Sequence, residues 1–154
     1  MPRWAARSRA ALLAAALAAC ARPAPLVRSM PVAALPGDEL AAVRAAVTAF
    51  VVGEARGEES VDTLLAREAD VVTDGVPLAR RPRLAGMPGP GTGAVVEFRG
   101  HVAGDFAWAV VAYTWQADDP AGAEFGRATF VLGRMPAGWR IRHVHASHVE
   151  RWGR

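Results

Sequence analysis

Four consecutive segments in the second half of the chain constrain its fold more than any other feature. Each is rich in β-branched and aromatic residues, which is typical of strands. They span residues 94–102, 106–116, 125–134 and 139–149. Turn residues separate them, and Gly104 with Asp105 forms the tightest connection. Because strands joined in series by short turns pair with their neighbours, the pattern predicts an antiparallel sheet.

The preceding residues predict helices instead. Apolar side chains recur there at helical spacing, at Leu40, Val43, Val47, Phe50 and Val51. Asp38 can cap this helix, and Gly53 or Gly57 can end it. A shorter helix over 60–65 and a short strand over 70–72 should follow. The expected fold class is α+β, with a cone-shaped, curved antiparallel sheet packed against N-terminal helices in one domain over residues 37–154.

Residues 79–93 interrupt this pattern. The segment carries Arg80, Arg81 and Arg83, followed by glycines and prolines at six positions. Such a composition does not sustain a helix or a strand. We therefore expect a mobile loop whose arginines are solvated.

The strand over 106–116 is apolar on both sides. Phe106, Trp108, Val110 and Ala112 alternate with Ala107, Ala109, Val111, Tyr113 and Trp115. Helices can cover only one side of a sheet. A homodimer in which the sheet packs against its copy would cover the other side, where we expect Trp115 and its neighbours. In the alternative, a monomer covers that side with loops or with its C-terminal tail.

The first residues resemble a bacterial export signal. Three arginines precede an apolar stretch that is too short to cross a bilayer. The sequence Leu17-Ala18-Ala19-Cys20 then looks like a lipobox, in which a lipid joins the cysteine sulfur, cleavage follows, and an acyl chain such as palmitate is added. The alternatives are a plain secretory signal and translation that starts at Met30.

These features predict a lipoprotein signal peptide over residues 1–19 and a proline-rich tether over residues 20–36. Cys20 would anchor the protein to a lipid bilayer of the bacterial cell envelope, facing the periplasm or the exterior. It is also the single cysteine of the chain, which excludes an internal disulfide and a cysteine-ligated metal.

Charge excludes one class of partner. The calculated pI is about 10.3, but three of the 18 basic residues lie in residues 1–19, which hold no acid. The remainder has 15 basic and 15 acidic residues and no lysine. Because it lacks a basic excess, we expect no nucleic-acid partner.

The last two predicted strands carry a family resemblance. Residues 126–132, a turn, and residues 138–147 are similar to the end of SnoaL-like domains, with Trp139, Ile141, His143, His145 and Ser147 at alternate positions. These domains belong to the nuclear transport factor 2-like (NTF2-like) superfamily, together with ketosteroid isomerase-like proteins. The resemblance covers residues 38–149. It implies a cone-shaped fold with a pocket and, commonly, dimers formed through the sheet, while the catalytic aspartate of ketosteroid isomerase has no counterpart that we can place.

Strict alternation places His143 and His145 on the same face as Trp139, which should line the cone. The resemblance directs Arg127 and Thr129 towards the same cavity. The candidate ligand-binding residues are His143, His145, Arg127, Thr129, Tyr113 and Trp139. Imidazole can act as a general acid or base near neutral pH, and an arginine can hold a carboxylate or enolate oxygen.

Other interpretations of these residues remain open. The histidines could instead satisfy a polar patch of the core by bonding to Tyr113, Thr129 or Ser147. A metal held by His143, His145 and His101 is disfavoured, because no carboxylate has evident ligand spacing, and we expect no metal and no cofactor. Three functions follow: a domain that binds a small molecule or peptide, an isomerase, cyclase or dehydratase, or a dimeric assembly module.

Overall fold

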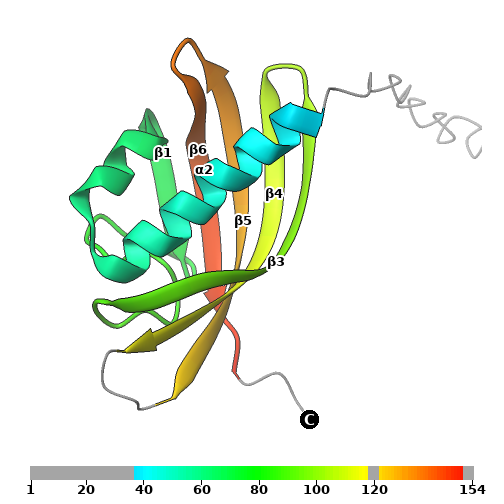
Figure 1. Cartoon of the computed structure of the whole chain (residues 1–154). Coiled ribbons are helices and arrows are strands. Elements are labelled where there is room, and N and C mark those ends of the chain that lie inside the picture. The colour runs from blue at the N-terminus through cyan, green and yellow to red at the C-terminus, as the bar shows by residue number, and fades with distance from the viewer. Residues whose placement is uncertain (1–36, 118–121, 151–154) are drawn as a thin grey trace, which may run out of the picture. The chain divides into compact units, whose positions relative to one another are not determined.

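The computed structural model describes residues 37–117 and 122–150 (Figure 1). The predicted signal peptide, lipobox and tether lie outside these residues. The elements, in chain order, are helix α2 (Gly37–Arg56), 3-10 helix η2 (Glu59–Leu64), and strands β1 (Leu65–Thr73), β2 (Val76–Pro77), β3 (Gly91–Ala103), β4 (Phe106–Ala117), β5 (Ala123–Met135) and β6 (Gly138–His148). The described helices include none that is long and apolar enough to cross a bilayer.

Helix α2 follows the predicted apolar spacing but runs past Gly53. Val43, Val47, Phe50 and Val51 are fully buried along one side. Gly53 does not end the helix. A Cβ atom there would lie 2.0 Å from Val61 Cγ1, so glycine lets η2 pack closely against α2. The helix ends before Gly57, whose φ of 69° reverses the backbone while Glu58 N donates to Gly53 O at 2.9 Å.

The sheet has six strands in the order β2-β1-β6-β5-β4-β3, and its edges do not close on each other. Strands β3 to β6 form the predicted antiparallel series, with a turn at Gly104 between β3 and β4. Strand β1 is the exception, because it pairs in parallel with β6 and is longer than the predicted strand over 70–72. The α+β prediction of a curved sheet packed against an N-terminal helix is confirmed.

Helix α2 lies across one side of the curved sheet, which we call the inner face (Figure 1). Strands β4, β5 and β6 contribute most of its buried residues, which include Ala107, Ala109, Val111, Tyr113, Trp115, Ala128, Phe130, Leu132, Trp139, Ile141, Val144 and Ala146. Phe50 of α2 meets Phe130 edge to face, with ring centroids 5.8 Å apart. Each large apolar side chain buried here contributes about 1.5–3 kcal/mol. The core of this domain is thus complete within the described residues.

Candidate functional site

A β-bulge in β6 separates the residues that alternation had placed together. Leu132 pairs with Ile141, but the next residue back, Val131, pairs with His143, so Arg142 is an extra residue on β6. An extra residue moves every later side chain to the opposite face. Val144 and Ala146 are therefore buried on the inner face after the bulge. The prediction that His143 and His145 share a face with Trp139 is wrong, because both histidines lie on the side away from α2, the outer face.

Arg127 and Thr129 lie on the outer face as well. Thr129 pairs with His145, and Arg127 pairs with Ser147. A shallow hollow of about 160 Å³ has Val110, Arg127, Ala128, Thr129, His145 and Ser147 as its lining. The structure thus brings Arg127, Thr129 and His145 together, but in a surface hollow and not inside the cone.

The outer face also exposes large apolar side chains of β4. Phe106 is 58% exposed, Trp108 47% and Val110 36%. The sequence predicted that one face of this strand would be left uncovered by helices, but placed Trp115 there. Trp115 is buried on the inner face instead, so the uncovered face is that of Trp108.

Charged side chains on the outer face pair with one another. Arg99 Nη2 lies 2.8 Å from Glu97 Oε1, and Arg127 Nη2 lies 3.9 Å from Glu97 Oε2. Arg142 Nη1 lies 3.2 Å from Glu68 Oε1. The Arg142 side chain crosses Gly133, where a Cβ would lie 2.3 Å from Nε, and its guanidinium reaches the Phe106 ring at 5.9 Å. The face therefore exposes Trp108 and Val110 with ion-paired side chains around them.

Trp139 and Tyr113 remain on the inner face, apart from the other four candidates. Trp139 Nε1 donates to Glu39 Oε2 at 2.9 Å, and Arg134 stacks 4.8 Å above the indole ring. The hydrogen bond from Arg134, helped by that from Trp139, lowers the pKa of Glu39. Burial, with the nearby charge of Asp74, raises the pKa of Tyr113. Tyr113 is therefore a neutral donor, and its hydroxyl donates to Ala85 O at 2.7 Å.

The partner of Tyr113 belongs to a segment that enters the cone. Residues 78–90, which we call the plug, contain no helix or strand, as predicted, but residues 91–93 of the predicted loop belong to β3. Leu84, Ala85 and Met87 are nevertheless buried, with exposures of 2%, 3% and 5%. Gly86 sits against β5 and β6, since a Cβ there would lie 3.1 Å from His148 Cδ2. The plug thus occupies the side of the sheet where a pocket was expected.

A buried ion pair holds the plug on α2. Glu54 is fully buried, and it accepts from Arg83 N at 2.6 Å, Arg83 Nε at 3.0 Å and Arg83 Nη2 at 2.5 Å. Arg83 also donates to Asp62 Oδ1 at 2.7 Å, and Thr73 Oγ1 donates to Arg83 O at 2.5 Å. Burial opposes the charge on Arg83, but the two carboxylates outweigh it and raise the pKa of Arg83. The expectation of solvated arginines is wrong for Arg83.

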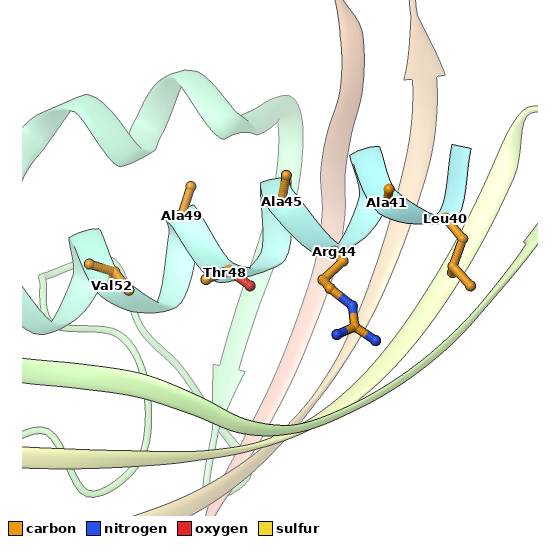
Figure 2. A pocket seen from close by; sticks show the side chains of 7 residues that line it. All are labelled: Leu40, Ala41, Arg44, Ala45, Thr48, Ala49 and Val52. Atoms are coloured by element: carbon orange, nitrogen blue, oxygen red, sulfur yellow. The ribbon is translucent and has the colours of Figure 1, made fainter. Parts of the chain in front are cut away.

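Helix α2 has a second hollow that the sequence did not single out. It is shallow, measures about 690 Å³, and has Leu40, Ala41, Arg44, Ala45, Thr48, Ala49 and Val52 as its lining. In Figure 2 the three alanines lie along one side of the helix and Leu40 and Arg44 along another. Arg44 lies 4.6 Å from the centre of the Phe98 ring of β3. The sequence signal for this hollow was a row of alanines four residues apart, on the side of the helix opposite the buried valines.

Within residues 37–117 and 122–150, no three histidine, aspartate or glutamate side chains gather in a way that could hold a metal ion. His101 stacks near Trp108, with ring centroids 6.3 Å apart, and so lies across β4 and β5 from His143 and His145. His148 points away from them, and its Nε2 lies 3.0 Å from Glu124 Oε2.

Comparison with known proteins supports the family resemblance. Residues 88–150 match the family described as SnoaL-like domain. Residues 88–150 of this chain are therefore SnoaL-like. Among curated proteins, none matches the sequence.

The chain is also similar to solved structures. One is an NTF2-like protein with a cystatin-like fold from Novosphingobium aromaticivorans, with a TM-score of 0.60 and 15% identity over 75% of this chain and 85% of that one. Another is a proposed dehydratase of the NTF2-like family from Streptomyces avermitilis, with a TM-score of 0.59 and 20% identity over 75% and 99%. A third is a ketosteroid isomerase-like protein from Erwinia carotovora atroseptica, with a TM-score of 0.56 and 15% identity over 75% and 99%. At these identities the likeness establishes the NTF2-like fold alone.

Proposed function

We propose that this chain is an envelope lipoprotein whose SnoaL-like domain assembles with a second copy through the outer face. The observation that carries the proposal is the half-exposed Trp108, which lies with Phe106 and Val110 on a sheet face that α2 and the plug leave uncovered. Aromatic side chains at the centre of a surface are typical anchors of protein interfaces. The plug favours this function over binding inside the cone, because Leu84 and Met87 are buried on that side of the sheet.

The size of the face suits a stable dimer. Strands β3 to β6 contain 11 to 13 residues each. At about 3.3 Å per residue and 4.8 Å between strands, they form a face of about 700 Å². A standard interface buries about 800 Å² on each partner. A second copy of the same sheet is therefore large enough to cover this one.

The charge pattern favours a second copy over a charged partner. Glu97 pairs with Arg99 at 2.8 Å and lies 3.9 Å from Arg127, and Glu68 pairs with Arg142 at 3.2 Å. A two-fold interface places the same patch on both sides, so an uncompensated charge would be duplicated there. This face reduces that cost, because Arg99, Arg127 and Arg142 each have a carboxylate within 3.9 Å in the same copy, although Arg99 and Arg127 share theirs.

A substitution at the centre of the face tests the assembly. Trp108→Glu should turn a dimer of the domain, residues 37–154, into a monomer at about 20 µM, because each copy would bury an unpaired carboxylate. Val76→Glu is the matched control, since Val76 is 56% exposed on edge strand β2. Sedimentation velocity measures the mass, and circular dichroism checks that both variants fold. A wild-type monomer at this concentration would contradict the proposal.

The lipid anchor is supported by the lipobox-like Leu17-Ala18-Ala19-Cys20. A serine hydroxyl cannot form the thioether that the lipid requires. Cys20→Ser should therefore abolish incorporation of a labelled fatty acid and leave the protein unprocessed or released from membranes. Continued labelling of this variant in the membrane fraction would overturn the lipoprotein proposal.

A second candidate function is ligand binding in the hollow of the outer face. This candidate rests on Arg127, Thr129 and His145, which line the same hollow. At about 160 Å³ it is smaller than the usual ligand pocket of about 300–1,000 Å³. A second copy laid over this face would enclose the hollow from its open side. Ligand density or a native mass shift that appears only in the dimer would support this candidate.

A further inference from the structure

We infer that self-association through the outer face is acid-labile, with His101 and His145 as the groups that respond to pH. This inference rests on the proposed dimer and adds its regulation. Its basis is the strand register, which sets both histidines beside the exposed apolar residues that a second copy would cover.

The register groups the outer face into rows that cross the sheet. In one row, His101 of β3 pairs with Trp108 of β4, which pairs with Val131 of β5, and Val131 pairs with His143 of β6. In the next row, Val110 pairs with Thr129, and Thr129 pairs with His145. His101 and His145 are exposed, and His143 is half-buried. A partner that covers Trp108 and Val110 therefore covers these imidazoles as well.

The charged groups around each histidine differ. On the outer face of β3, Arg99 lies two residues from His101, and strand β4 presents only uncharged Trp108 and Phe106 to it. Around His145, strand β5 contributes Arg127 to the shared hollow, while β1 places Val72 opposite.

Strand β1 also contributes an acid. Asp70 is opposite His143 and therefore diagonal to His145, and Arg142 and its partner Glu68 lie beside His143. A nearby carboxylate favours a protonated imidazole, whereas a nearby guanidinium disfavours it. Burial by a second copy should therefore disfavour protonation most at His101, next at His145 and least at His143.

Covering these histidines favours their neutral form, because burial removes the water that stabilises an imidazolium. In a two-fold dimer each histidine occurs twice, so protonation adds like charges in pairs to an interface that already holds arginines. The dissociated copies then bind more protons than the dimer. By linkage, association weakens as the pH falls through the range in which free imidazole is protonated.

The test measures the dimer dissociation constant of residues 37–154 at about pH 7.5 and about pH 5.5, on either side of imidazole titration. Sedimentation equilibrium gives the constant, and the full chain in a non-ionic detergent provides a check by chemical cross-linking. The wild-type Kd should rise at least about tenfold at the lower pH. In His101→Gln/His145→Gln the rise should shrink to less than about threefold, because glutamine keeps a polar group but takes up no proton.

His148→Gln is the matched control. It removes a histidine from the same strand, β6, but one that points away from His145 and pairs with Glu124. Its dimer should retain the full pH dependence, and His143→Gln should retain most of it. Denaturant melts at both pH values separate loss of assembly from loss of folding.

The outcomes separate this inference from the proposal beneath it. A chain that is monomeric at both pH values would refute the dimer itself. A dimer with the same Kd at both pH values would refute only its acid lability. A pH dependence that persists in His101→Gln/His145→Gln would also overturn the inference, since the response would then belong to other groups.

Discussion

The two faces of the sheet are built from the same strands, yet α2 and the plug cover one of them and leave the other exposed. On the inner face, α2 and the plug close over the apolar residues, and two of the polar side chains buried there, Glu54 and Tyr113, have hydrogen-bond partners. On the outer face, Trp108 stays half-exposed among paired charges. Strand β4 supplies apolar side chains to both, so residue type does not distinguish them. What distinguishes them is whether another part of the chain covers the face.

Among the changes that test this contrast, removal of the buried cation should have the largest effect on stability. Arg83→Ala leaves the Glu54 carboxylate without its partner inside the protein. An unpaired buried charge costs about 3–5 kcal/mol, so the free energy of unfolding should fall by that amount. Urea denaturation measures it. Arg80→Ala removes an exposed arginine of the same segment and should change stability by less than about 0.5 kcal/mol. Similar effects of both variants would mean that the plug does not depend on the ion pair.

Two neighbouring valines give a sharper comparison. Val111 is 1% exposed on the inner face, and Val110 is 36% exposed on the outer face of the same strand. Val111→Ala should destabilise the monomer by about 1.5–3 kcal/mol, because a buried valine is lost and a cavity remains. Val110→Ala should cost less than about 0.5 kcal/mol in the monomer but weaken the dimer. Equal losses in denaturant melts run below the dimer dissociation constant would contradict the assignment of the faces.

The smallest effect concerns Asp62, at the exposed edge of the ion-pair cluster. Hydrogen bonds from Arg81, and then from Arg83, lower the pKa of Asp62 below its ordinary value. A lowered folded pKa means that the ionised carboxylate stabilises the fold at neutral pH, and that this contribution is lost as the pH falls through the folded value. The side chain is 49% exposed, so Asp62→Asn should cost less than about 1 kcal/mol.

This difference between Asp62→Asn and the wild type should shrink towards zero in acid. Denaturant melts at a series of pH values measure it. A difference that grew on acidification would show that Asp62 does not interact with the arginines as an anion.

Much of the fold was predictable because it depends on local patterns. The apolar spacing of Val43, Val47 and Phe50 predicted α2, and the turn at Gly104 predicted the β3–β4 hairpin. The parallel pairing of β1 with β6 was not predicted. That pairing joins segments about seventy residues apart, and a short strand pattern carries no record of its direction.

The candidate site was predictable only in part, for a geometric reason. Arg127, Thr129 and His145 do converge, because pairing between β5 and β6 follows from the hairpin. Their face was misassigned, because the extra residue at Arg142 reverses the alternation and has no sequence signal of its own. Whether any of these residues binds a ligand stays a prediction.

The sequence by itself determined which segments become strands or helices and which strand would be apolar on both sides, because those properties follow from each residue and its near neighbours. Only the tertiary structure decided which side α2 covers, where the plug lies, and that Arg83 is buried against Glu54. These outcomes depend on contacts between segments far apart in the chain. A buried charge is tolerated only where a distant partner meets it, and the pattern around Arg83 alone contains no trace of Glu54.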